Sequence, residues 1–185
     1  MKSKTLYILL GIFFVLLGGW LYLKWGGERP AAHNIDWGMN LLTRETVDGI
    51  TITEGKEHIQ LSRQSSGIWF VNGANADEDA IKRFWDQWKT VAIQGPVSTN
   101  KNNHQAFMVD DALGRSVVFR TDQKELLHVI IGSLSPTSDG SYVRRASEDA
   151  VYTVMPSLTT LFSLNAEDWK PKSKQETTKE GKKNK

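Results

Sequence analysis

The longest uninterrupted apolar run of the chain is Thr5–Leu23, which contains no charged residue. A helix of that length rises about 28 Å, close to the hydrocarbon thickness of a bilayer. The aromatic residues Trp20, Tyr22 and Trp25 at its end are typical of the interfacial belts of membrane proteins. The pattern predicts a single transmembrane helix within residues 1–25. A retained signal anchor is favoured over a cleaved signal peptide, because the run is long and lacks a nearby small-residue cleavage site.

The charges around this run predict its orientation. Lys2 and Lys4 precede it, whereas Lys24 and Arg29 behind it are partly offset by Glu28. The positive-inside rule therefore favours a translocated C-terminal part. We expect a single-pass protein of the cytoplasmic (inner) membrane whose domain faces the periplasm or the exterior.

Alternation of polar and apolar residues dominates the region after a linker over residues 26–45. His58–Arg63 alternates as a half-buried strand does, and Ile68–Val71 is a short apolar run that ends at Asn72-Gly73. Together with the apolar positions of residues 47–52, these runs predict an antiparallel meander joined by short turns.

One segment has helical rather than strand periodicity. Ile81, Phe84, Trp85 and Trp88 follow one another at the spacing of a single helix face. Asn75 precedes them as a candidate N-cap. The pattern predicts an amphipathic helix over residues 75–91, with Gly95-Pro96 beyond its end.

The second half returns to strand patterns. Four strands are expected at Ser116–Thr121, Glu125–Ile131, Ser141–Arg145 and Val151–Val154, as two hairpins. The predicted fold class is α+β: an antiparallel sheet with one main amphipathic helix packed on a face, preceded by the single N-terminal transmembrane helix. The α+β domain is expected over residues 46–169.

The ends of the chain differ in charge from its middle. Acidic residues outnumber basic ones over residues 30–169, which argues against a nucleic-acid-binding domain. Residues 170–185 form a Lys-rich tail that is expected to be disordered, because it has almost no apolar residue to bury. The tail is either a solubilising segment or a basic arm for anionic lipid or an acidic partner.

Several local motifs occur in an order that resembles a bacterial family of unknown function, the DUF4340 family. The motifs are Gly67–Val71, Val129–Gly132, Gly140–Arg144 and Ala150–Tyr152. The family's Tyr-Gly-Leu step before the middle strands is replaced here within Phe107–Leu113. The resemblance implies a membrane-anchored α+β domain that is often associated with gliding-motility-type ABC transporter components, and it implies no established activity.

Catalytic and cofactor-binding motifs are not recognisable. The chain has no cysteine, and its four histidines lie in separate elements without metal-ligand spacing. Nucleophile-elbow, phosphate-loop and dinucleotide motifs do not occur. We therefore expect neither an enzyme nor a bound cofactor or metal.

Two features are candidates for ligand or partner contact. Ser133, Ser135 and Ser138 lie in the glycine- and hydroxyl-rich stretch Gly132–Gly140, and such loops bind anions through backbone N–H groups. Arg144 and Arg145 follow in a predicted strand, where neighbouring side chains face opposite sides. Whichever arginine points inward needs a carboxylate partner.

Two functions remain open at this stage. The first is a non-catalytic, membrane-anchored accessory or adaptor domain of a bacterial envelope assembly, with a protein partner and possible proximity to a transporter. The second is an extracytoplasmic binding module for a small anion or an envelope polymer.

Overall fold

The computed structural model describes residues 13, 15–20, 37–122, 124–136 and 139–172. The chain divides into two compact units, Met1–Asn34 and Ile35–Lys185. In the first unit, Phe13 and residues 15–20 are helical and mostly exposed, and the rest of the expected anchor lies outside the described residues. Residues 173–185 of the Lys-rich tail also lie outside them.

The expectation of a single-pass transmembrane signal anchor is corrected by this structure. A helix needs about 20 predominantly apolar residues to cross a bilayer. No helix in the described part of the chain is both long enough and apolar enough to do so.

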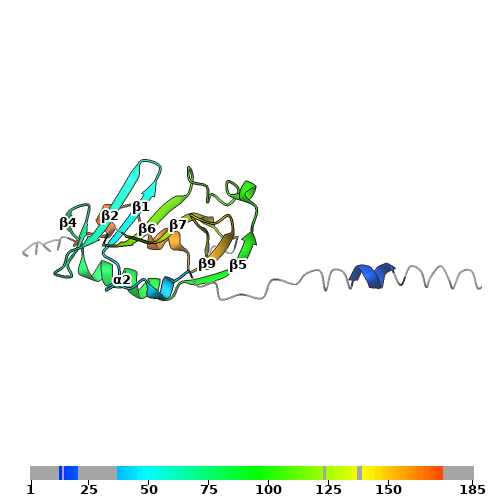
Figure 1. Cartoon of the computed structure of the whole chain (residues 1–185), viewed down its shortest axis with the longest axis horizontal. Helices are drawn as coiled ribbons and strands as arrows, with labels where there is room; N and C mark the ends of the chain where they lie inside the picture. The colour runs from blue at the N-terminus through cyan, green and yellow to red at the C-terminus, as the bar shows by residue number, and fades with distance from the viewer. Residues whose placement is uncertain (1–12, 14, 21–36, 123, 137–138, 173–185) are drawn as a thin grey trace, which may run out of the picture. The chain divides into compact units, whose positions relative to one another are not determined.

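The second unit is built on an antiparallel sheet of nine strands in the order β4-β3-β2-β1-β6-β7-β8-β9-β5 (Figure 1). The strands are β1 (Gly49–Glu54), β2 (Glu57–Arg63), β3 (Trp69–Val71), β4 (Ala74–Asn75), β5 (Ala92–Ser98), β6 (Arg115–Thr121), β7 (Lys124–Leu134), β8 (Ser141–Arg145) and β9 (Val151–Met155). The helices are α2 (Glu78–Trp88) and α3 (Leu158–Leu161), with 3-10 turns η1 (Met39–Leu41), η2 (Lys101–Asn103) and η3 (Ala166–Asp168).

The predicted α+β class, with its anchor helix, is therefore wrong. Strands dominate the described residues, and the helices among them are few and short. The difference arises partly because the sheet extends into segments without strand periodicity. Ala92–Ser98 contains Gly95 and Pro96 yet forms β5, since a strand at the sheet edge tolerates proline.

Helix α2 begins later than its apolar pattern predicted. Asp77, rather than Asn75, is the N-cap, and its side chain accepts a hydrogen bond from the backbone N–H of Asp79. Asn75 instead lies in β4. The turn between β3 and β4 places Asn72 and Gly73 at φ 47° and 82°, a left-handed pair that Asn and Gly adopt at least cost.

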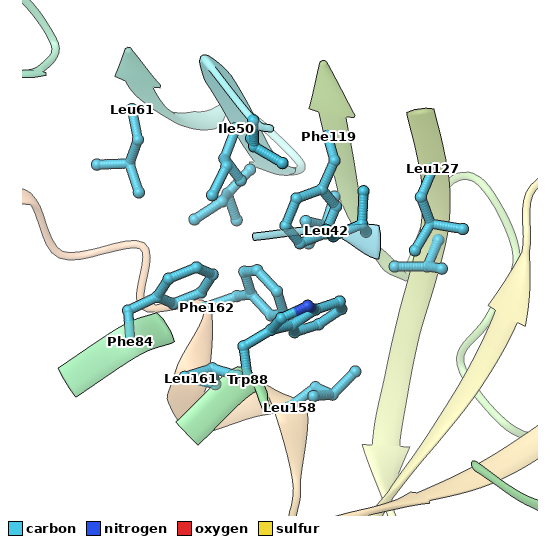
Figure 2. Close-up of a cluster of buried hydrophobic side chains, with 14 of the residues drawn as sticks. Leu42, Ile50, Leu61, Phe84, Trp88, Phe119, Leu127, Leu158, Leu161 and Phe162 are labelled. Carbon is cyan, nitrogen blue, oxygen red and sulfur yellow. The ribbon is translucent and has the colours of Figure 1, made fainter. Parts of the chain in front are cut away.

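One face of the sheet and α2 enclose the main core. Figure 2 shows Phe84 and Trp88 of α2 pointing toward Ile50 and Phe119 on the strands. Phe162 packs edge-on against Phe84, with ring centroids 5.4 Å apart. Each such buried large apolar side chain contributes about 1.5–3 kcal/mol relative to an exposed one. This side of the sheet is thereby closed by packed aromatic rings.

Part of the expected linker also belongs to this core. Trp37 and Leu42 are buried in it, and the ring of Trp37 packs edge-on against Tyr152 at 5.2 Å. The Nε1 of Trp88 donates a hydrogen bond to the carbonyl oxygen of Met39. The folded structure therefore includes residues before Thr46.

Candidate functional site

A loop covers part of the other face of the sheet, over β7, β8 and β9. We call residues 100–114 the capping segment. Its Val109 is fully buried and packs with Ile130 of β7 and Val151 of β9. Phe107 meets the ring of Tyr142 with centroids 4.6 Å apart. The capping segment thus forms a second, smaller core on this face.

Arg144 fastens the capping segment to the sheet. Its Nε donates to the carbonyl oxygen of Val109 at 2.9 Å, and its Nη2 donates to Oδ1 of Asp111 at 2.6 Å. Its Nη1 donates to the carbonyl oxygens of Ala146 at 3.1 Å and Glu148 at 3.3 Å. The guanidinium is buried, so these bonds replace the water it loses on folding.

Strand β7 holds the same segment at a second point. The backbone N–H of Ser133 donates to the carbonyl oxygen of Phe107 at 3.1 Å. Gly132 lies so close to this loop that an added Cβ would overlap the backbone oxygen of Phe107. A third attachment comes from His104, whose Nε2 donates to the carbonyl oxygen of Asp149 at 2.8 Å. Hydrogen bonds at Val109, Phe107 and His104 therefore fix the position of the capping segment.

A small cavity of about 120 Å³ lies where the capping segment meets the ends of β1, β6 and β7. Met108 and Leu113 form apolar parts of its wall, although their side chains are 44% and 46% exposed. Met108 has a φ of 56°, a left-handed conformation that is costly for a residue other than glycine, asparagine or aspartate. Backbone strain of this kind is often found at functional sites.

The polar side of this cavity is held by Arg115. Its Nε donates to Oε2 of Glu54 at 2.6 Å, and its Nη1 donates to the carbonyl oxygens of Thr159 at 2.7 Å and Phe162 at 2.8 Å. These contacts join β1, β6 and the α3 region at the cavity wall. The arrangement gives a rigid rim with two exposed apolar side chains beside it.

The structure separates the residues that the sequence singled out for ligand contact: Ser133, Ser135, Ser138, Arg144 and Arg145. Ser133 and Arg144 both hold the capping segment. Ser135 is buried, and its N–H donates to the carbonyl oxygen of Gly140. Arg145 is half-buried and pairs with Glu148 at 3.4 Å. Ser138 lies outside the described residues.

Sequence reasoning missed most of the cavity residues. Asp111 was not among the residues that the sequence singled out, yet it is the carboxylate partner of the inward-facing Arg144. The required partner of a buried arginine was the one signal available for finding it. Met108, Leu113 and Arg115 gave no such signal, because no local pattern marks residues that meet only in the folded chain.

His104 and His128 both have hydrogen-bonding partners within the chain. In the described ranges, no group of three or more His, Asp or Glu side chains is placed to hold a metal ion. His104 bonds to a backbone carbonyl, and Nε2 of His128 lies 2.8 Å from the hydroxyl oxygen of Ser116. Neither histidine lines the cavity beside Met108. The geometry defines a β-sheet domain with a fixed loop and an apolar contact surface.

Comparison with known proteins identifies the family. The model of a domain of unknown function, DUF4340, matches residues 69–176, which is more than half of the chain. The chain therefore belongs to the DUF4340 family, and the resemblance noted in its sequence is confirmed. The match includes α2, the capping segment and strands β3 to β9. Neither the curated proteins nor the solved structures contain a match to this chain.

Proposed function

We propose that this chain is a non-catalytic accessory or adaptor domain of a bacterial envelope assembly that binds a protein partner through the capping segment. The observation that carries the proposal is the surface formed by Met108 and Leu113 around the cavity. We call these two side chains and the cavity between them the capping-segment surface.

Exposed apolar side chains next to a cavity are suited to a protein partner. Contact sites often consist of a few apolar residues that fit a pocket on the other protein, surrounded by polar groups. Met108 adds conformational adaptability, because methionine packs against differently shaped surfaces. Its left-handed backbone keeps this side chain exposed beside the cavity, although strain opposes that conformation. The Glu54–Arg115 pair supplies the polar rim.

The partner class is taken from the family resemblance. The resemblance implies that domains of this kind are often associated with gliding-motility-type ABC transporter components, so such a component of the envelope is the expected partner. The proposal includes an extracytoplasmic location of the domain. Alkaline phosphatase fused after Lys185 should be active in living cells if this location is correct. An inactive fusion that is present at normal amounts would contradict the location alone.

Anion binding through the predicted Ser/Arg residues has less support. The Arg144 guanidinium already donates to four backbone carbonyls and one carboxylate of its own chain. Arg145 is paired with Glu148. An anion would have to compete with these internal partners.

Affinity capture of the full chain from cross-linked envelope preparations tests the adaptor proposal. The variant Met108→Asn/Leu113→Asn removes both apolar side chains, and asparagine tolerates the left-handed backbone at position 108. The matched control is Ile68→Asn, which removes a side chain that is 52% exposed in a different part of the domain.

The wild type and the Ile68 variant should capture the same partner. The double variant should bind this partner at least about tenfold more weakly, because residues at the centre of an interface can contribute about 2 kcal/mol. All three proteins should unfold at similar temperatures. Equal capture by the double variant would reject the proposed surface, and a monomer with no reproducible partner would reject the adaptor function.

A further inference from the structure

A second cavity lies between α2 and the segment of residues 160–169, and it shares no lining residue with the cavity beside Met108. Its volume is about 210 Å³. Polar groups of Arg83, Gln87, Ser163 and Asp168 line it, together with the buried rings of Phe84 and Trp169. Drug-sized ligands occupy cavities of about 300–1,000 Å³, so this one suits a smaller molecule.

The cavity contains one positive and one negative side chain that do not pair. Within the described residues, neither Arg83 nor Asp168 forms an ion pair, with each other or with another side chain. Lys82 in α2 and Lys89 at its C-cap differ from Arg83 in this respect, because both form ion pairs with Asp86. Arg83 thus keeps its donors available at the cavity.

The carboxylate of Asp168 is held in a fixed position. Its Oδ2 accepts a hydrogen bond from the hydroxyl of Ser163 at 2.5 Å. The adjacent Trp169 is anchored by its Nε1, which donates to the carbonyl oxygen of Ser163 at 3.1 Å, and by its own carbonyl, which accepts from the N–H of Asp77 at 2.7 Å. Preorganised groups of this kind lower the entropy that binding costs.

We propose that this cavity binds a small dipolar molecule that carries both a carboxylate and an ammonium group, of the size of a small amino acid. The carboxylate pairs with the planar donor fork of Arg83, the side chain best suited to bidentate carboxylate contacts. The ammonium group pairs with Asp168. Gln87 and Ser163 provide further hydrogen-bonding groups, and the buried rings of Phe84 and Trp169 form rigid walls.

Isotope-edited NMR titration of the full chain with L-alanine tests the proposal. Propionate lacks the ammonium group, and L-alaninamide lacks the carboxylate, so each carries only one of the two charges. Saturable shifts of amides in α2 and residues 160–169 are expected with L-alanine. Each single-charge compound should bind about tenfold more weakly or not at all.

Matched variants assign the two charges. Arg83→Gln and Asp168→Asn should each weaken L-alanine binding by about tenfold. Arg120→Gln and Asp139→Asn should leave it unchanged, because those side chains are exposed and do not line the cavity. Unchanged shifts in the first two variants would overturn the assignment, as would equal binding of propionate or the absence of saturable L-alanine binding. Thermal unfolding of each variant confirms that it is folded.

Discussion

The contacts of Arg144 predict a strong asymmetry between the two members of its ion pair. The arginine side chain is 6% exposed, whereas that of Asp111 is 86% exposed. An exposed carboxylate is still well solvated after its partner is removed. The carbonyl groups that face Arg144 lie in buried or half-buried residues, Val109, Ala146 and Glu148, so water replaces a lost donor there less easily.

The expected magnitudes follow from these exposures. Arg144→Met leaves the carbonyl oxygens of Val109, Ala146 and Glu148 without this donor. Each hydrogen bond to a charged group contributes about 1.5–3 kcal/mol, and a buried carbonyl group left without a donor costs about 1–3 kcal/mol. We expect Arg144→Met to lower the free energy of unfolding by about 3–5 kcal/mol. Asp111→Ala should lower it less, by about 1.5–3 kcal/mol, because Arg144 loses its charged partner but keeps its bonds to the backbone carbonyls.

Urea unfolding followed by tryptophan fluorescence measures both changes. Arg145→Met is the matched control, because it removes the neighbouring, half-exposed arginine of the same strand. Its effect should stay below about 1 kcal/mol, as for other exposed pairs. If Asp111→Ala destabilised the protein as much as Arg144→Met, the ion pair rather than the backbone contacts would hold the capping segment, and the reasoning would be refuted.

Two further predictions test the packing of the sheet. Gly132→Ala should lower the free energy of unfolding by about 1–3 kcal/mol, because the added Cβ would overlap the backbone oxygen of Phe107. The control Gly95→Ala, whose Cβ meets no atom within 4 Å, should be nearly neutral in urea unfolding. Equal effects of the two substitutions would contradict the close approach at Gly132. Burial, and secondarily the charge of Glu148, raises the pKa of Tyr152 above its ordinary value of 10.0. The stability that comes from the neutral Tyr152 hydroxyl is therefore fully present below the pKa that this group has in the unfolded chain. It is lost as the pH rises through the higher pKa of the folded protein. Tyr152→Phe should unfold less readily than wild type in alkaline pH titrations, and an unchanged alkaline profile would contradict this.

Helix α2 shows how much a local pattern can predict. The spacing of Ile81, Phe84, Trp85 and Trp88 identifies one apolar face, and all four side chains are buried in the structure. The first residue of the helix was harder to predict, because Asn75 and Asp77 are both good N-cap residues. Asp77 rather than Asn75 caps the helix because Asn75 pairs with Phe70 in the β3–β4 ladder.

The site shows what a local pattern cannot predict. Strand alternation indicated that one of Arg144 and Arg145 points inward. Which of them does so depends on the register between strands, in which Arg144 pairs with Ile130 and Val151 on the capped face. Asp111 is far away in sequence and reaches Arg144 only through the loop that both residues stabilise.

The arrangement of the sheet also limits how a partner can bind. Helix α2 covers one face, and the capping segment covers part of the other. The described edge strands are poor templates for an added strand, because β4 has two residues and β5 contains Pro96 and two register shifts against β9. Partner binding by strand addition is therefore disfavoured. Side-chain contacts at Met108 and Leu113 remain available, because these residues lie outside the strands and are exposed. The proposed partner contact at the capping-segment surface needs no added strand and is therefore compatible with these edges.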